Sequence, residues 1–210
     1  YIIIFLYRAV NKMLNIIKFL LFNPFIELVI WIDYFINFIP GKIGKIIRIL
    51  WFSIRFKKIL KVIIDTNCEF KGLKNIFFAN GVGISKNCSF YADEGKIYVS
   101  EGTAFNSGCH INASIGGAIK IGKKCPIGPN VVMRTASHNY EKVDKFIQDQ
   151  GHKYADINIA DNCWIAANVI IVGGVNIGSG SVIGANSVVT KNIPPNSVAV
   201  GIPAEVIKNR

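Results

Sequence analysis

An apolar residue returns at every sixth position over a long stretch of this 210-residue chain. Between residues 159 and 189 these positions hold Ile159, Ile165, Ile171, Ile177, Ile183 and Val189. An amphipathic helix needs apolar spacings of three and four, and a half-buried strand alternates by two, so the pattern matches neither element. A fixed short period indicates a repeat architecture in which stacked units share one core.

The repeat extends well upstream of residue 159. The same spacing recurs at Ile121, Ile127 and Met133, and at Val99, Phe105 and Ile111. Four positions after each of these residues lies a second position that is mostly small. We therefore expect three hexads, roughly 18 residues, to form one coil of a triangular prism whose stacked coils bury the aliphatic column.

All five cysteines occupy the small position of the repeat: Cys68, Cys88, Cys109, Cys125 and Cys163. Their number is odd and no two are spaced as CxxC, which argues against a disulfide framework or a zinc site. Free cysteine behaves as a small buried hydrophobe. We expect reduced thiols in the core.

The basic charge is concentrated in the first 64 residues, which carry ten Lys or Arg against Glu27 and Asp33. These cations are embedded among Ile, Phe and Leu instead of polar loops with interspersed aromatics, so nucleic acid is not the expected partner. Residues 8–18 have helical periodicity, and a second helix is predicted from Asn23-Pro24 to Phe38. The basic stretch that follows contains Lys42, Lys45, Arg48, Arg55, Lys57, Lys58 and Lys61.

Wide apolar faces, thin polar stripes and a basic flank are typical of helices that lie in a membrane interface. We expect residues 1–61 to associate with an anionic membrane surface and residues 62–210 to form the repeat domain. No uncharged run reaches the roughly 18 residues of a spanning helix. A tilted or re-entrant insertion, or helices that only pack on the prism or between subunits, are the alternatives. The start lacks a basic leader and a cleavage site, so we expect a cytoplasmic protein attached to the inner face of the cell membrane.

The repeat is interrupted once, at about residues 138–156, and His138 opens this excursion. A neutral imidazole held between a rigid coil and a loop is suited to take a proton from a hydroxyl. A structural role is the alternative for a lone histidine. His110 and His152 are weaker candidates, because His110 follows a core cysteine and His152 lies in a polar excursion without a rigid frame. No close histidine pair is expected, so no metal is predicted.

Three segments resemble the hexapeptide-repeat acyltransferases, specifically the maltose, galactoside and capsule or O-antigen O-acetyltransferase branch. They are IADNCWIAANVIIVGGV from Ile159, IGANSVVTKNIPPNS from Ile183 and VGIPAEVI from Val200. The resemblance covers roughly residues 97–208. It implies a left-handed parallel β-helix, although crossovers between parallel strands are usually right-handed. It also implies a homotrimer with active sites between neighbouring prisms.

The resemblance further implies acetyl-CoA as the acyl donor and no metal. By position in the motif, His138 resembles the general base and Asn112 resembles a residue that contacts the acceptor sugar. An asparagine turn that closes a corner is the alternative for Asn112. The positions that match donor-binding residues are Trp164, Ala167, Ala185, Thr190, Lys191 and Lys208. Trp164 could instead cover a coil edge, and Thr190 and Lys191 could form an exposed turn. Lys208 stands where the family more often has arginine.

The leading hypothesis is an O-acetyltransferase that modifies a sugar hydroxyl of a surface glycan precursor. The membrane-seeking amino-terminal region favours a saccharide acceptor that is lipid-linked, such as a polyprenyl-linked one. Two alternatives remain: an acetyltransferase for a small soluble sugar or sugar amine, and a non-catalytic scaffold tethered to the membrane.

Overall fold

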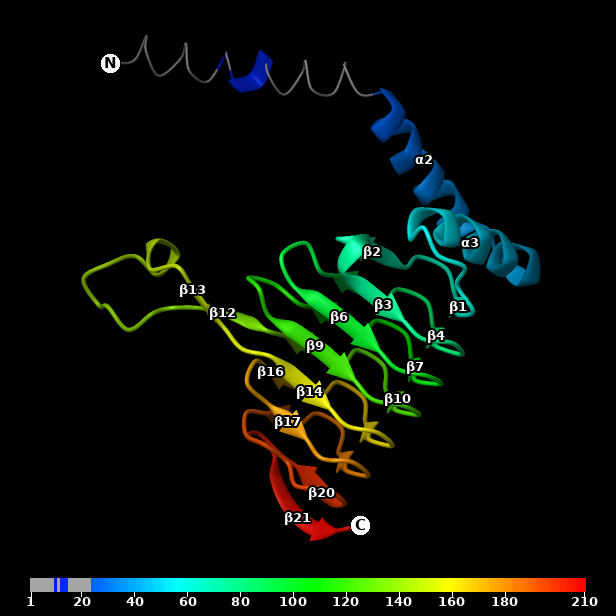
Figure 1. Ribbon diagram of the computed structural model, residues 1–210. Helices are drawn as coiled ribbons and strands as arrows, with labels where there is room; N and C mark the ends of the chain where they lie inside the picture. The colour runs from blue at the N-terminus through cyan, green and yellow to red at the C-terminus, as the bar shows by residue number, and fades with distance from the viewer. Residues whose placement is uncertain (1–9, 11, 15–23) are drawn as a thin grey trace.

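The computed structural model describes residues 10, 12–14 and 24–210, and within these residues most of the chain is a stack of short-stranded coils (Figure 1). Successive coils pair through parallel strands, and three strands from each regular coil contribute to three separate sheets. The stacked three-sided coils predicted from the six-residue period, and the parallel β-helix implied by the family resemblance, are therefore confirmed. We call the three sheets walls A, B and C.

Each wall contains one strand from nearly every coil. Wall A contains β1 (Ile63–Ile64), β4 (Gly83–Ile84), β7 (Ala104–Phe105), β10 (Pro126–Ile127), β15 (Trp164–Ile165), β18 (Val182–Ile183), β20 (Ser197–Val200) and β21 (Glu205–Asn209). Wall B contains β2 (Glu69–Lys71), β5 (Ser89–Tyr91), β8 (His110–Asn112), β11 (Val132–Arg134), β16 (Ile170–Val172) and β19 (Val188–Val189). Wall C contains β3 (Ile76–Phe78), β6 (Lys96–Val99), β9 (Ala118–Ile121), β14 (Ile157–Ile159) and β17 (Asn176–Ile177). The last strand, β21, runs antiparallel to β20.

The aliphatic positions of the repeat form continuous columns inside the prism. In wall B, Ile111 pairs with Met133, Met133 with Ile171, and Ile171 with Val189. All four side chains are buried. Each column gains stability from removing apolar surface from water, and no coil can bury its own inner face without its neighbours.

The corners depend on two residue types for different reasons. Asn130, Asn168 and Asn186 have φ values of 57°, 58° and 60°, a left-handed conformation that asparagine tolerates. Gly122 is instead required by close packing, because a Cβ there would lie 2.5 Å from the carbonyl carbon of Ala160. Gly178 would similarly bring a Cβ within 2.4 Å of the nitrogen of Pro195. Adjacent coils therefore approach too closely at these corners for any side chain.

The cysteines are free and buried, as the repeat predicts. Their thiols lie against carbonyl groups of the next coil, for example Cys88 Sγ at 3.1 Å from the oxygen of Asn106. Burial raises the pKa of Cys68 to about 12. That thiol therefore stays protonated at neutral pH and acts as a core side chain.

Two helices adjoin the amino-terminal end of the prism, α2 (Pro24–Phe38) and α3 (Gly41–Arg55), and Figure 1 shows α3 over the first coil with α2 leading away from it. The second predicted helix corresponds to α2, whereas the basic stretch after Pro40 also proves to be helical. Phe52 of α3 packs edge-on against Phe70, with ring centroids 4.9 Å apart. Phe56 contacts both Phe70 and Phe78. Aromatic rings thus close the first coil, which would otherwise expose its core.

Arg48 of α3 is fully buried, which corrects its place in the predicted lipid-facing basic stretch. Its guanidinium donates hydrogen bonds to the carbonyls of Ile39 at 2.6 Å and Ile64 at 3.0 Å. Ile39 follows the carboxyl end of α2, where the helix dipole favours a cation. Arg55 likewise pairs with Asp33 of α2 at 2.9 Å. Both arginines therefore hold the helices to each other and to the first coil.

Among the described residues, none of the helices has the length and apolar character needed to traverse a bilayer. Most of the predicted helical segment 8–18 lies outside the described residues.

Candidate active site

A hairpin arm leaves the prism where the six-residue repeat breaks. Its two strands are β12 (Ala136–His138) and β13 (His152–Tyr154), and the 3₁₀ helix η2 (Ile147–Asp149) lies near its tip. The strands pair antiparallel, with Ala136 opposite Tyr154 and His138 opposite His152. Figure 1 shows this arm projecting away from the stacked coils.

The root of the arm is anchored to wall B and to the neighbouring corner. Thr135 is buried, and its backbone N–H donates to the carbonyl of Asn112 at 3.2 Å. The hydroxyl of Thr135 accepts from the N–H of Ser114 at 2.9 Å, and its carbonyl accepts from Ala155 at 3.1 Å. These bonds place the first strand of the arm directly beside the end of β8.

His138 is exposed, and its ring faces the ring of His152 with centroids 4.1 Å apart. The ladder of β12 and β13 frames both rings. We expected His152 to lack a rigid frame and the chain to lack a close histidine pair. Both expectations are wrong, because the two strands of the arm hold His138 and His152 next to each other. In the part of the chain that the structure describes, no group of three or more His, Cys, Asp or Glu residues could hold a metal ion.

The distal part of the arm has its own hydrogen bonds but exposes apolar side chains. Gln150 Nε2 donates to the carbonyls of Lys142 at 2.8 Å and Lys145 at 2.9 Å. Nevertheless Val143 is 101% exposed and Phe146 is 83% exposed. The arm is thus internally ordered and presents an apolar tip that none of the residues described by the structure covers.

Asn112 ends strand β8 on the outer surface of wall B. It lies in register between Tyr91 and Arg134. Its φ is not among the positive values of the corner asparagines, so the turn interpretation is wrong for this residue. A cavity of about 350 Å³ contains Asn112 together with Lys71, Tyr91, Asp93, Glu94, Ala113 and Ser114. The predicted acceptor residue therefore lines a polar hollow beside the root of the arm.

A hydrogen-bonded cluster adjoins this hollow on wall B. The hydroxyl of Tyr91 donates to Glu69, and Lys71 Nζ lies 3.1 Å from Glu69 Oε1. Burial alone would raise the pKa of Glu69, but the hydrogen bonds from Tyr91 and Lys71 outweigh it and leave the pKa lowered. Burial is the main cause that raises the pKa of Tyr91, and the hydrogen bond to the Glu69 carboxylate raises it further. Glu69 therefore stays ionised and Tyr91 stays protonated at neutral pH.

His110 belongs to this cluster on the outer face of wall B. Its Nδ1 lies 2.7 Å from the hydroxyl oxygen of Ser89, and its ring meets Tyr91 edge-on at 5.2 Å. Burial is the main cause that lowers the pKa of His110, and the nearby positive charge of Arg134 lowers it further. The neutral imidazole is favoured, and it is already engaged by its neighbours.

Sequence reasoning missed most of this cluster, namely Glu69, Lys71, Ser89, Tyr91 and Arg134. A signal was present, because each of these residues is one position before or after an aliphatic or aromatic core residue of wall B. Alternation along a strand sends such neighbours outward. Register between coils, which the repeat length sets, then brings them together.

Most of the predicted donor-binding residues lie on wall A or at its corner with wall B, away from the end of β8 where Asn112 lies. Trp164 lies on wall A and is 52% exposed. Ala167 and Ala185 follow β15 and β18 at the same corner, one coil apart. Thr190 and Lys191 are exposed after β19, and Lys208 is exposed on β21 opposite Val198. The chain therefore bonds the root of the arm to Asn112 through Thr135, places His138 three residues farther along the arm, and leaves the donor residues spread over its carboxyl-terminal coils.

Comparison with known proteins agrees with this architecture. Residues 156–191 match the family described as bacterial transferase hexapeptide (six repeats). The galactoside O-acetyltransferase of Escherichia coli K12 is 36% identical over 134 residues, which cover 63% of this chain and 57% of that protein. The Staphylococcus aureus Mu50 protein named "Putative acetyltransferase SAV2555" is 36% identical over 146 residues, or 69% of this chain and 71% of that one.

Among solved structures, the Vibrio cholerae hexapeptide-repeat acetyltransferase VCA0836, complexed with acetyl coenzyme A, superposes with a TM-score of 0.53. The two chains share 24% identity over 83% of this chain and 80% of that chain, so this likeness concerns the fold. This chain belongs to the hexapeptide-repeat acetyltransferase family, as the sequence resemblance predicts. This chain spans about half the length of the first curated relatives that it matches, with aligned shares of 42% to 60% of those proteins.

Proposed function

We propose that this protein transfers an acetyl group from acetyl-CoA to a sugar hydroxyl. The observation that carries the proposal is the exposed imidazole of His138 on an ordered arm, whose root is hydrogen-bonded through Thr135 to Asn112 at the edge of a polar hollow. The relatives support it, because one is a galactoside O-acetyltransferase and a neighbour in fold was solved with acetyl coenzyme A.

His138 would act as the general base. Its neutral ring accepts the proton of an acceptor hydroxyl, whose oxygen attacks the thioester carbonyl of the donor. The carbon–sulfur bond then breaks, and the coenzyme leaves as the thiol after it takes up the proton from the imidazolium. General acid–base assistance of this kind typically contributes about 10² to 10⁴ in rate. His152, packed against the ring, restricts its orientation.

The residues predicted for the donor have the sizes and charges that such a molecule requires. Ala167 and Ala185 are small, so they leave the corner between walls A and B open to an extended arm of pantetheine. Lys191 and Lys208 are exposed cations that can meet phosphate oxygens. Trp164 supplies an exposed apolar ring on the adjacent wall.

A complete site requires a second copy of the chain. Asn112 and the arm lie at the edge of wall B that adjoins wall C, whereas Trp164, Ala167 and Ala185 lie on wall A and at its corner with wall B. Walls A and B also carry exposed apolar residues, including Trp164, Ile170 and Val172, and the arm ends in the uncovered Val143 and Phe146. We propose a homotrimer in which each arm tip packs on the neighbouring prism and the acyl donor lies between them.

The helices α2 and α3 supply a surface suited to a membrane interface. Along α3, Ile43, Ile46, Leu50 and Ile54 form one exposed stripe, and Ile43 is 71% exposed. Trp31, Tyr34 and Phe35 are exposed on α2. Lys42, Lys57 and Lys58 remain exposed beside these apolar residues, although Arg48 and Arg55 do not. Apolar insertion and attraction of lysines to anionic lipid act together at such a surface.

This surface favours an acceptor that also resides at the membrane. We propose a lipid-linked precursor of a surface glycan as acceptor and the inner face of the cell membrane as the location. A sugar amine is the competing acceptor, and a non-catalytic scaffold is the competing role.

The acceptor test uses the purified chain, acetyl-CoA and polyprenyl-linked glycan extracts. We expect free coenzyme to be released and one glycan species to gain the mass of one acetyl group. Mild base should remove that group, because an ester is hydrolysed where an amide survives. A base-stable product would assign the reaction to a sugar amine, and the absence of both products would favour the scaffold.

The membrane test is sedimentation with vesicles that contain phosphatidylserine. We expect the protein to sediment with them, and the double variant Ile43→Asp, Leu50→Asp to remain largely in solution. Ile207→Asp, a change at an exposed residue of β21 at the opposite end of the prism, is the matched control and should sediment like the original chain. If the original chain stays in solution, the membrane part of the proposal is lost.

A further inference from the structure

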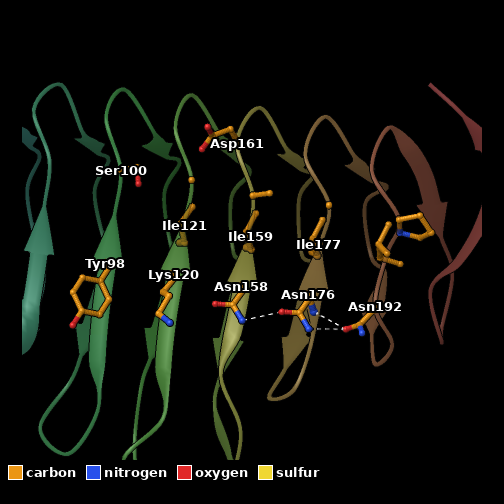
Figure 2. A pocket seen from close by; sticks show the side chains of 15 residues that line it. Tyr98, Ser100, Lys120, Ile121, Asn158, Ile159, Asp161, Asn176, Ile177 and Asn192 are labelled. Atoms are coloured by element: carbon orange, nitrogen blue, oxygen red, sulfur yellow. Dashed lines mark hydrogen bonds between the residues drawn. The ribbon is translucent and has the colours of Figure 1, made fainter.

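Wall C carries a groove of about 860 Å³ that none of the residues predicted for acetyl transfer lines. Figure 2 shows its side chains across successive coils. One row consists of the outward residues Tyr98, Lys120, Asn158, Asn176 and Asn192. The other row lies at the adjoining corner and consists of Ser100, Gly122, Ala160, Asp161, Gly178 and Pro194.

The asparagine row is held in place yet keeps unused hydrogen-bonding groups. Asn158 Nδ2 donates to Asn176 Oδ1 at 2.8 Å, and Asn176 Nδ2 donates to Asn192 Oδ1 at 3.2 Å (Figure 2). Each amide has two N–H donors and an oxygen with two lone pairs. The ladder therefore orients the three side chains and leaves further donors and acceptors facing the groove.

Opposite this row, most of the corner residues are small, which keeps the groove open. A Cβ at Gly122 or Gly178 would collide with the backbone of the next coil, so these positions cannot accommodate a side chain. At the end nearest the helices, Tyr98 stacks on Phe77 with ring centroids 4.8 Å apart and planes inclined by 10°. A fixed aromatic ring thus lies at one end of the row that contains the asparagines.

The charges of the groove argue for an uncharged ligand. Lys120 lies 3.9 Å from Asp156, and one oxygen of Asp161 accepts the backbone N–H of Lys123 at 2.7 Å. The groove therefore lacks the unpaired cluster of cations expected for a phosphate ligand. Its outward row is polar, in contrast to the apolar residues on walls A and B, so wall C is suited to remain in solvent when copies of the chain associate.

We propose that the wall C groove binds an extended chain of uncharged sugars. Amides that both donate and accept match neighbouring hydroxyl groups, and the ring of Tyr98 can contact the apolar face of a sugar. The inference rests on the proposed function in one respect: the bound chain would be the glycan that is acetylated.

The direction of the groove agrees with such a ligand. From Tyr98 to Asn192 the row crosses four steps between coils, which at about 4.8 Å a step amounts to roughly 19 Å. It runs along the stacking axis from the coils near α2 and α3 toward the carboxyl end. A glycan anchored in a membrane beneath the helices would extend along it.

Saturation-transfer NMR with the full chain tests this groove directly. The probes are maltoheptaose, laminariheptaose and cellohexaose at millimolar concentration, with glucose as the short control. We expect at least one oligosaccharide to bind and glucose to give little signal. Asn176→Ala should weaken that binding about fivefold, because it removes hydrogen bonds without altering a core position. Lys96→Ala changes an exposed residue of the same wall outside the groove and should leave binding unchanged.

No binding of any of the three oligosaccharides would overturn the proposal, and so would binding that Tyr98→Ala and Asn176→Ala both leave intact. A change in oligomeric state for these variants, seen by light scattering, would assign wall C to a contact between copies and would also overturn it. His138→Ala should bind the oligosaccharide normally. For the original chain, absence of acetyl transfer with oligosaccharide binding intact would count only against the proposed function, and acetyl transfer without oligosaccharide binding would count only against the groove.

Discussion

Wall B and the arm carry the three histidines of the chain in opposite settings. His110 is half-buried in wall B, next to Ser89 and Tyr91, at a position that the repeat determines. His138 and His152 lie outside the repeat, where two strands of the arm hold them in front of solvent. The regular coils supply rigidity through buried columns of side chains and backbone hydrogen bonds between successive coils. The single interruption supplies a side chain that remains free to react.

The largest expected difference between wall B and the arm is in how much a substitution lowers the stability of the protein. Ile111→Ala removes a fully buried side chain from the column of wall B and should lower the free energy of unfolding by about 2–5 kcal/mol. Val143→Ala at the tip of the arm should change it by less than about 0.5 kcal/mol, because that side chain is fully exposed. Both values come from urea unfolding of the variants. Equal losses would mean that the arm belongs to the cooperative core.

The next largest expected effect is on the rate of acetyl transfer, which should depend on the arm. Replacing residues 140–150 with a short glycine-containing turn, while His138 and His152 remain, should reduce kcat/KM by at least about 10²-fold, or about 2.7 kcal/mol in the barrier. The reason is that the arm would no longer reach the neighbouring prism and orient its base. The thermal midpoint should remain close to that of the original chain. Undiminished acetyl transfer would show that the arm is dispensable.

The smallest effect concerns the pH dependence of stability. Because burial and Arg134 lower the pKa of His110 in the folded chain, the unfolded chain binds more protons below its ordinary value of 6.5. Stability should therefore fall as pH decreases from 6.5 toward the lowered pKa. His110→Asn should flatten this part of the profile by a modest amount, since the ring is only half-buried. An unchanged profile would show that His110 does not sense its surroundings in this way.

The repeat itself was predictable because its signal is local and periodic. Residues six apart, such as Ile165 and Ile171, identify the inward positions of neighbouring walls. The same spacing predicts that the five cysteines are buried. The wall B cluster was less visible, because Glu69, Tyr91 and His110 belong to three coils whose lengths differ. Their proximity depends on how residues inserted at each corner shift the register.

Two features of the helices and the arm could not be predicted from the periodic pattern. Arg48 stands in a stretch of apolar and basic residues, and nothing in that pattern distinguishes a lysine at the surface from an arginine that binds the carbonyls of Ile39 and Ile64. Likewise, His138 and His152 are separated by a polar loop whose length does not specify a ladder. Hairpin register, rather than sequence spacing, makes them a pair.

The central claim is that the exposed imidazole of His138 removes the acceptor proton. Its most direct test is the rate of acetyl transfer by His138→Ala, with and without added imidazole, beside the matched variant His110→Ala. We expect His138→Ala to lose about 10² to 10⁴ in kcat while remaining folded, and to recover part of that rate with imidazole. Transfer by His138→Ala at the rate of the original chain would contradict the account.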